Sequence, residues 1–458
     1  MLYGIVLYGL FQSAIAIGQA LSLVSSPHRF FAITGTIGNP GPLGGFLAVA
    51  VVCSFALLRQ AVQKKKLRWT LINGTIACFL ITGLILTDSR AAFLSATIGL
   101  LVVWSDKIWN RFKKHKMVIS LSFAGIVVVL LCCLYYYRHA SADARLLIWQ
   151  VSARIVIDKP LCGHGIGAFN REYMLYQAAY FEQHPQSSFV MVADNVAYPY
   201  NEFLHVLIEL GIIGGILLIA VFIAGFTTRS SGIIDRSLKA GLATFIVFSL
   251  FSYPVVIFEL LLLPAIFLGT LLGRTFYTLR IFYWMKLIGI VLLISITVFA
   301  VAEIRVAKKT FEEIVQLTIS DTKIPTPYCD RYFFIFVYNI NFNTAYLSAL
   351  CQLPCQLDYW PKIKRICPSS ETFCQLGEAC ECYGQYEQAE QFYRKAANMV
   401  PTRIVPNYHL WQLYIKQGYY DQAQAIAQKI LSQPVKVETT FTLRIKGQVK
   451  QYLLQLGS

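Results

Sequence analysis

Charged residues are scarce in this sequence, and acidic residues are the scarcest. Only 14% of the 458 residues are charged, with 24 Asp and Glu against 40 Lys and Arg, while 56% are hydrophobic and the mean hydropathy is +0.54. This composition excludes a soluble protein with a large core and is typical of a chain that crosses a membrane several times. The net charge of +16 does not indicate nucleic-acid binding, because the basic residues gather in short loops between apolar runs.

The N-terminus lacks the basic segment and cleavage site of a removable signal peptide, since Met1 leads directly into apolar residues. Apolar runs long enough to be considered as membrane spans follow one another from there. They lie at roughly 2–24, 43–59, 70–87, 91–104, 117–136, 201–226, 239–253, 255–273 and 283–301. The sequence therefore predicts an all-α fold, with a polytopic bundle of about nine transmembrane helices over residues 1–301.

Basic residues in four loops orient this bundle, because cytoplasmic loops carry an excess of Lys and Arg. These residues are Arg59, Lys64, Lys65, Lys66 and Arg68; Lys107, Arg111, Lys113, Lys114 and Lys116; Arg229, Arg236 and Lys239; and Arg274, Arg280 and Lys286. The loops at 25–42, 87–90 and 137–200 and the tail 302–458 are then expected outside the cytoplasm. We expect 137–200 to form a small lid over the mouth of the bundle.

The tail has a repeating pattern of small and aromatic residues that is typical of tetratricopeptide repeats. The first copy spans about 370–403 and the second, 34 residues later, about 404–437. The positions that carry the pattern are Phe373, Leu376, Gly377, Cys380, Gly384, Tyr386, Ala389, Tyr393, Ala396 and Pro401, then Leu410, Tyr414, Gly418, Tyr420 and Ala423. Helical stretches at 302–320, 331–353 and 438–456 are expected to complete a stack that holds a protein partner.

Twelve cysteines divide between the spans and the outer segments. Cys53, Cys78, Cys132 and Cys133 fall in spans and are interpreted as small apolar residues. The others are Cys162, Cys329, Cys351, Cys355, Cys367, Cys374, Cys380 and Cys382. Structural disulfides, free thiols and metal ligation all stay open for them, although no pair has the spacing of a typical zinc site.

A polar stripe marks the start of the run at 201–226. Asn201, His205 and Glu209 are spaced by four residues and so share one face of a helix. Ionisable groups in a membrane helix usually face a bundle interior or a wet cavity, which favours a functional site. The alternative is structural, with Asn201 as a helix cap and Glu209 paired to a basic residue of a neighbouring helix.

Two arginines lie near the outer surface, and a glycine-rich loop lies there as well. Arg90 sits at a tight hairpin and Arg145 at the start of the long outer loop. The planar fork of an arginine suits a phosphate or diphosphate, although such side chains also extend to lipid head groups. The loop from Thr34 to Gly45 permits tight turns and a close approach of backbone to a ligand.

These motifs, in this order, resemble the O-antigen ligase and O-antigen polymerase superfamily of bacterial envelopes, over about residues 1–275. The matching features are Gly35-Thr-Ile-Gly-Asn39-Pro, Ser89-Arg90-x3-Leu94, Arg145-x3-Trp149 with Gly163-x-Gly165-x-Gly167, and Asn201-x9-Gly211-x2-Gly214. Appended tetratricopeptide repeats also occur in relatives of this family.

The resemblance implies a multi-pass protein of the bacterial inner membrane, with the large loop and tail in the periplasm. It implies transfer of a glycan from an undecaprenyl-diphosphate carrier to a lipid, glycan or protein acceptor, with no metal and no cofactor. Arg90 and Arg145 would bind the diphosphate and stabilise its charge, and Gly35 and Asn39 would approach the substrate. Asn201 would position the acceptor, and Glu209 would orient the polar stripe.

Two features depart from the family pattern. Tyr200 stands where the ligases typically have a His, the proposed base, and a tyrosine with its ordinary pKa of about 10 is a poor base at neutral pH. His205 and Glu202 are the alternative bases, so a polymerase or protein-glycosylating role stays open beside a ligase role. The family also usually has more spans before the glycine-rich loop, so we expect that N-terminal spans are missing here.

Two other classes of function remain as rivals. A transporter is expected to carry polar groups near the middle of several spans, whereas here they gather at the outer mouth. A catalytically degenerate protein would use the spans as an anchor and the repeats as a scaffold. The identities of the sugar and the acceptor, the partner of the repeats and the oligomeric state do not follow from the sequence.

Overall fold

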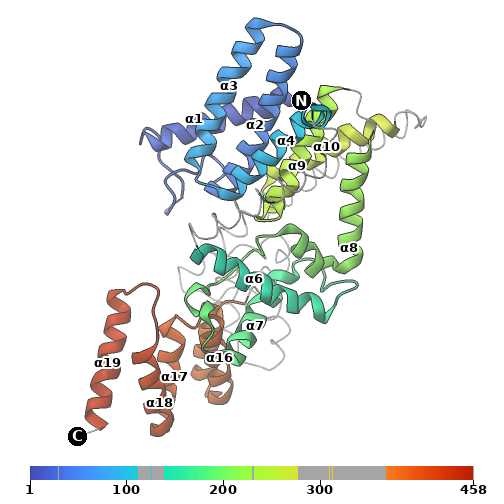
Figure 1. The fold of residues 1–458 in the computed structure, drawn as a ribbon. Coiled ribbons are helices and arrows are strands. Elements are labelled where there is room, and N and C mark those ends of the chain that lie inside the picture. The colour runs from blue at the N-terminus through green and yellow to red at the C-terminus, as the bar shows by residue number, and fades with distance from the viewer. Residues whose placement is uncertain are drawn as a thin grey trace. The chain divides into compact units, whose positions relative to one another are not determined.

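The computed structural model describes residues 1–28, 30–111, 125, 139–228, 232–276, 309, 312 and 368–456, and this part of the chain is helical, with no strand. It divides into a first unit, Met1–His139 with Tyr198–Ile281, and a second unit, Ala140–Ala197 with Phe282–Ser458 (Figure 1). The all-α fold class is thus confirmed for the described residues. Apart from single positions, the runs predicted at 117–136, 283–301, 302–320 and 331–353 lie outside them.

The first unit is a bundle of helices around α2. Its elements are α1 (Leu2–Ala20), α2 (Pro40–Gln63), α3 (Leu67–Leu86), α4 (Arg90–Arg111), α8 (Glu202–Thr227), α9 (Ile233–Ser249), the short η3 (Pro254–Val256) and α10 (Phe258–Phe276). Helix α2 packs against α1, α3, α4, α9 and α10 and is almost entirely buried. Close approaches at small residues bring the helices together, with Gly44 of α2 against Ala92 of α4 and Gly9 of α1 against Ala50 of α2.

Within the described residues, α1, α2, α3 and α8 are long and apolar enough to cross a membrane, and Phe258–Gly273 is a shorter apolar helix. The chain is accordingly treated as a multi-pass membrane protein. The predicted number of nine spans stays a prediction.

The sequence predicted Arg59 in a loop, which is wrong: Arg59 lies in α2, because this helix continues to Gln63. Its guanidinium is buried and pairs with the Asp106 carboxylate of α4 at 2.6 Å, and Arg236 of α9 pairs with the same oxygen at 2.6 Å. The guanidinium also donates to the backbone carbonyl of Val103. A buried charge without partners is costly, so these bonds explain how the end of α2 retains an arginine.

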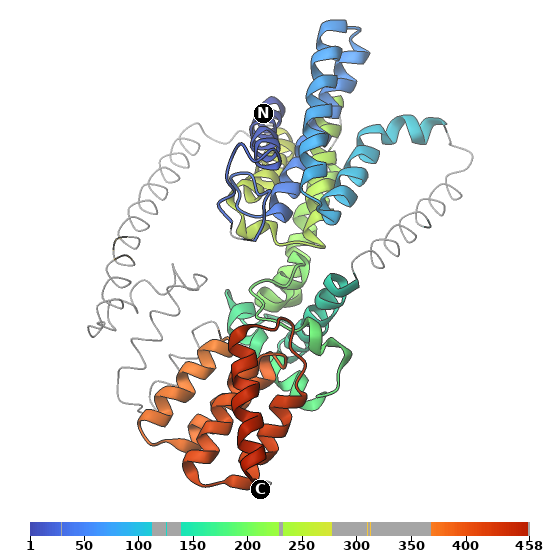
Figure 2. The same ribbon diagram turned by 90° about the vertical axis from the view of Figure 1, so that its left-hand side faces the viewer.

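The second unit combines the long outer loop with the tail. From the loop come α6 (His139–Asp158), α7 (Ala168–Gln183) and η2 (Ser188–Val192). From the tail come α15 (Ser370–Cys382), α16 (Tyr386–Met399), α17 (Ile404–Gln417), α18 (Tyr420–Ser432) and α19 (Thr440–Leu456). Figures 1 and 2 show the tail helices side by side, and α7 of the loop packs against α16.

The tail helices form two pairs with the predicted spacing. Helices α15 and α17 begin at 370 and 404, and α16 and α18 begin at 386 and 420, so each pair is offset by 34 residues. Gly377 lies directly against the ring of Tyr393, where a side chain would collide. This is the close helix contact expected from the small residues, although the assignment to tetratricopeptide repeats stays a prediction.

The loop and the tail are joined by buried hydrogen bonds. The Gln177 side chain of α7 donates to the backbone carbonyl of Asp194 at 3.1 Å and to that of Met399, the last residue of α16. Tyr173, which is fully buried, donates its hydroxyl proton to Gln177 at 2.8 Å. Burial raises the pKa of this phenol above its ordinary value, so Tyr173 stays a neutral hydrogen-bond donor. The placement of the loop as a lid over the bundle stays a prediction.

Six of the cysteines lie in the described part of the chain, and none of them is in a disulfide: Cys53, Cys78, Cys162, Cys374, Cys380 and Cys382. Of the alternatives left open for the outer cysteines, structural disulfides are therefore wrong for Cys162, Cys374, Cys380 and Cys382. The other cysteines, which are Cys132, Cys133, Cys329, Cys351, Cys355 and Cys367, lie outside the described residues.

Candidate functional site

The polar stripe lies in the first turns of α8, where the chain turns into a helix at Asn201. Asn201 is extended, with φ of −159°, and its side-chain oxygen accepts a hydrogen bond from the N–H of Leu204 at 3.0 Å. This is the cap geometry that satisfies a backbone donor at a helix start. Asn201 is thus a helix cap, as the structural alternative predicted, and its side-chain oxygen is bonded to the backbone of α8.

His205 lies between two carboxylates of the same helix. Oε2 of Glu202 is 3.1 Å from its Nδ1, and Oε1 of Glu209 is 3.2 Å from its Nε2. Glu202 is only 5% exposed, and its other oxygen accepts the backbone N–H of Val255 at 3.0 Å. The spacing of four residues brings His205 and Glu209 onto one helix face, as predicted from the stripe, and Glu202, which was not part of the stripe, joins them three residues before His205.

This arrangement restricts where protons sit. An ionised carboxylate only accepts hydrogen bonds, so a ring nitrogen that faces one must carry the proton. With both carboxylates ionised, His205 donates from both nitrogens, and the three groups together carry one negative charge. Such a cluster takes up one further proton without leaving an unpaired buried charge.

A kink ends this polar segment of α8. Gly211 interrupts the helix with φ of 65° and ψ of −165°, a backbone conformation that side chains rarely adopt. Beyond it, the helix presents large apolar side chains to its surroundings, among them Ile213, Ile216 and Leu217. Glu202, His205 and Glu209 therefore all lie on the N-terminal side of the kink, and the exposed apolar surface lies on its C-terminal side.

Tyr200 precedes the cap in a strained conformation. Its φ is +52°, in the left-handed region that is rare for a bulky residue. Its ring meets that of Tyr253 edge to face, with centroids 5.3 Å apart, and the same Tyr253 ring stacks on Tyr198 at 4.4 Å. Tyr200 is thus held by a tyrosine from the connection between α9 and α10.

The glycine-rich loop is held by two glutamines of α1. Oε1 of Gln19 accepts the backbone N–H groups of Thr34 and Gly35 at 2.9 Å each, and Oε1 of Gln12 accepts that of Thr36 at 3.0 Å. Gly35 has φ of +56°, and a Cβ there would lie 2.5 Å from Gln12. The glycine is therefore required by a turn packed on α1, a structural role beside the predicted substrate contact.

Asn39 is likewise a helix cap. Its side-chain oxygen accepts the N–H of Gly41 at 2.9 Å at the start of α2. The predicted approach of Asn39 to the substrate stays a prediction.

The two predicted diphosphate-binding arginines belong to different units. Arg90 is the first residue of α4, in the first unit, and Arg145 lies inside α6, in the second. Both side chains are half-buried. Gly44 of α2 allows the turn before Arg90 to approach closely, since a Cβ there would lie 2.7 Å from that of Ser89. The shared role of these arginines at one diphosphate stays a prediction.

Residues 74–219 match the family model described as O-antigen ligase. The matched region contains Arg90, Arg145 and the segment from Tyr200 to Glu209, but not the loop at Gly35 or the tail. The match supports the O-antigen ligase superfamily and a membrane glycosyltransferase-type role in polysaccharide biosynthesis. The search of curated proteins found no match to the chain.

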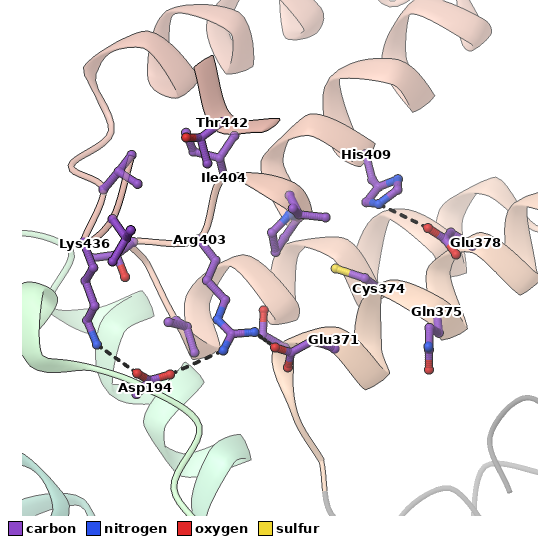
Figure 3. A pocket seen from close by; sticks show the side chains of 17 residues that line it. Asp194, Glu371, Cys374, Gln375, Glu378, Arg403, Ile404, His409, Lys436 and Thr442 are labelled. Atoms are coloured by element: carbon purple, nitrogen blue, oxygen red, sulfur yellow. Dashed lines mark hydrogen bonds and ion pairs between the residues drawn. The ribbon is translucent and has the colours of Figure 1, made fainter. Parts of the chain in front are cut away.

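The second unit contains a pocket of about 580 Å³, lined mostly by tail residues and by Asp194 of the outer loop. Figure 3 shows Asp194 between Lys436 and Arg403, and Arg403 also pairs with Glu371. Burial raises the pKa of the Cys374 thiol in its wall to about 12, so this thiol stays protonated. The charged groups of the pocket largely bond to one another, and through Asp194 they form a salt bridge between the outer loop and the tail.

Sequence reasoning missed Tyr253, Gln12 and Gln19. The glutamines had a readable signal, because two amides seven residues apart share one face of an otherwise apolar helix. Tyr253 had none, since its contacts with Tyr198 and Tyr200 bridge more than fifty residues. Within the described residues, no group of three or more His, Cys, Asp and Glu side chains has the arrangement of a metal site.

Proposed function

We propose that the protein is an inverting membrane glycosyltransferase that moves a glycan from an undecaprenyl-diphosphate carrier to an envelope acceptor. The observation that carries the proposal is the cluster of Glu202, His205 and Glu209 at the start of an apolar helix inside the O-antigen ligase region. Ionisable groups are expensive in a membrane helix and are usually retained for function. A cluster able to accept a proton is what activation of a hydroxyl requires.

The reaction needs one proton acceptor and one stabiliser of negative charge. The oxygen of the acceptor hydroxyl attacks the anomeric carbon, its new bond forms as the bond from that carbon to the diphosphate oxygen breaks, and the electron pair leaves with the diphosphate. The hydroxyl proton passes to a carboxylate oxygen of Glu202 or Glu209, because both nitrogens of His205 already carry protons. The charge of the cluster thereby changes from minus one to zero.

Arg90 and Arg145 stabilise the leaving diphosphate in this proposal. A guanidinium forms paired, charge-assisted bonds with phosphate oxygens, and these strengthen as the leaving group gains charge. Tyr200 lines the approach of the acceptor, and Asn201 acts by fixing the helix start. The base is therefore assigned to the cluster and not to Tyr200.

The test uses a deletion strain complemented with wild type, Arg145→Ala or the control Arg444→Ala, an exposed arginine of α19. Surface polysaccharide is followed by gel, and carrier-linked oligosaccharide by mass spectrometry. We expect wild type and Arg444→Ala to restore attached glycan, and Arg145→Ala to leave carrier-linked glycan to accumulate. Identical glycans in the deletion strain and its complemented forms would overturn the glycosyltransferase proposal.

The location and the tail complete the proposal. We infer that the chain lies in the bacterial inner membrane, with the long loop and the tail in the periplasm. The four loops rich in Lys and Arg alternate along the chain with these outer segments, and such basic loops usually lie in the cytoplasm. The paired helices α15 to α18 act as tetratricopeptide repeats that hold a protein partner. Their 34-residue offset is the observation that supports this reading.

A further inference from the structure

The connection between α9 and α10 holds the segment that leads into α8. The ring of Tyr253 stacks on that of Tyr198 with an interplanar angle of 10° and meets that of Tyr200 at 83°. Two residues later, the N–H of Val255 donates to Glu202 at 3.0 Å. One short connection therefore contacts the approach to α8 at three places, and all of them lie in the first unit.

Two of these three contacts fall on residues that are costly to maintain, Tyr200 and Glu202. A left-handed conformation at a residue such as Tyr200 is strained and persists only where the surroundings determine it. Glu202 is a buried carboxylate, and its hydrogen bonds offset the cost of burial. Tyr253 and Val255 supply part of both requirements.

We propose that Tyr253 is a positioning residue for the acceptor side of the transfer reaction. It acts through Tyr200, whose ring it contacts, and through the connection whose Val255 N–H bonds Glu202, and it makes no covalent step itself. The inference rests on the proposed glycosyltransferase function and deepens it. Tyr253 lies outside residues 74–219, so the family match does not assign it any role.

The physical basis is geometric. Without the Tyr253 ring, Tyr200 loses its edge-to-face partner and relaxes toward an ordinary φ, which shifts the start of α8. Glu202 and His205 then move relative to the acceptor hydroxyl. A displacement of about 1 Å at a reacting centre lowers a rate by about 100-fold. Donor binding at Arg90, which lies on α4, does not depend on this ring.

The experiment uses the full chain in detergent-solubilised membranes and three substitutions, Tyr253→Phe, Tyr253→Ala and Tyr253→Leu. The matched control is Phe258→Ala, an exposed aromatic residue at the end of the same connection. The donor probe is carrier-linked oligosaccharide extracted from the deletion strain, and membranes of that strain supply the acceptor. Transfer is measured against donor concentration, and thermal unfolding of each variant is followed in parallel.

We expect Tyr253→Phe to transfer at nearly the wild-type rate, because the ring contacts remain. For Tyr253→Ala and Tyr253→Leu we expect an apparent kcat lower by about 100-fold and an unchanged donor KM. Tyr253→Leu keeps most of the apolar volume, so its transfer rate tests the inference if Tyr253→Ala unfolds.

Three results would overturn the inference and leave the proposed function standing. They are a wild-type rate for both Tyr253→Ala and Tyr253→Leu, a rate for Tyr253→Phe as low as that of Tyr253→Ala, or a change confined to the donor KM. A wild-type protein that transfers nothing from the extracted donor would instead reject the proposed function, and the inference with it.

Discussion

Glu202 is the residue on which most of the proposed site depends. It bonds to His205 and to the backbone of Val255 while being almost wholly buried. Glu202→Gln keeps the shape and an oxygen that accepts from Val255, but it removes the charge that compensates His205. We expect transfer to fall by about 100-fold to 10,000-fold, the usual contribution of acid–base catalysis. Initial rates with wild-type and variant membranes measure the change.

The control for this prediction is Glu259→Gln, which removes a carboxylate from the first turn of α10. It lies outside the cluster, so its rate is expected to equal that of wild type. If Glu202→Gln also transferred at that rate, the cluster would have no part in accepting the proton.

A second prediction concerns Asp194, which joins the outer loop to the tail. Partial burial raises the pKa of this carboxyl, but the Asn195 N–H bond and the charges of Lys436 and Arg403 outweigh it, so its pKa lies below the ordinary value. A carboxyl group whose pKa is lowered in the folded state stabilises the fold at pH values above its ordinary pKa of about 3.9. This stabilisation is lost as the pH falls through the lowered pKa.

Asp194→Asn is therefore expected to loosen residues 188–197 at pH 7 and to have less effect as the pH falls through the lowered pKa of Asp194. The loss at neutral pH is about 0.2–1 kcal/mol, because the carboxylate is more than half exposed. Hydrogen exchange of the full chain measures it, with Asp421→Asn as an exposed control on α18. Equal protection of 188–197 in wild type and Asp194→Asn at pH 7 would contradict the bridge.

Single residues also show how far the sequence alone reaches. Helical spacing was enough to bring His205 and Glu209 together, and the chemistry of asparagine was enough to suggest the cap at Asn201. Tyr253 could not be predicted, because a ring contact between distant segments leaves no local pattern. The same holds for the pairing of Arg59 and Arg236 with Asp106, which depends on where three helices begin and end.

At the scale of elements, the close contact between α2 and α4 sets the position of Arg90. A Cβ on Gly44 would lie 2.7 Å from that of Ser89 and 3.0 Å from that of Ala92, closer than side chains pack. Gly44→Ala is therefore expected to push α4 away and to destabilise the fold by about 1–3 kcal/mol. Because the displaced turn carries Arg90, glycan transfer is expected to fall as well.

Thermal unfolding of the purified full chain measures the first effect, and transfer by its membranes the second. Gly74→Ala on α3 is the matched control, since nothing lies within 4 Å of its added methyl group. An unfolding temperature for Gly44→Ala equal to that of this control would show that α2 and α4 are not in close contact.

The elements were more predictable than their contacts. Apolar runs indicated α1, α2, α3 and α8 to within a few residues, and the 34-residue repeat placed the tail helices in register. Packing partners were not readable, because α7 of the outer loop binds α16 through Gln177, a residue without a recognisable motif. The kink at Gly211 was also missed, since a single glycine in an apolar run is common in membrane helices.

At the scale of the whole molecule, the orientation in the membrane decides whether the site meets its substrates. The basic loops predict that Cys162 of the outer loop and Cys382 of the tail lie outside the cytoplasm, and both thiols are free and exposed. In spheroplasts, a membrane-impermeant maleimide is therefore expected to label both, as located by mass spectrometry of the digested protein.

The matched control is a cysteine introduced at Lys65, in the exposed turn between α2 and α3 that the same rule assigns to the cytoplasm. It is expected to react only after the membrane is permeabilised, because the charged reagent does not cross lipid. Labelling of Lys65→Cys in intact spheroplasts, with Cys162 and Cys382 protected, would reverse the orientation. The carrier diphosphate on the periplasmic face would then be out of reach of Arg90 and Arg145, and the glycosyltransferase proposal would fail for a topological reason, whatever the chemistry of the cluster at His205.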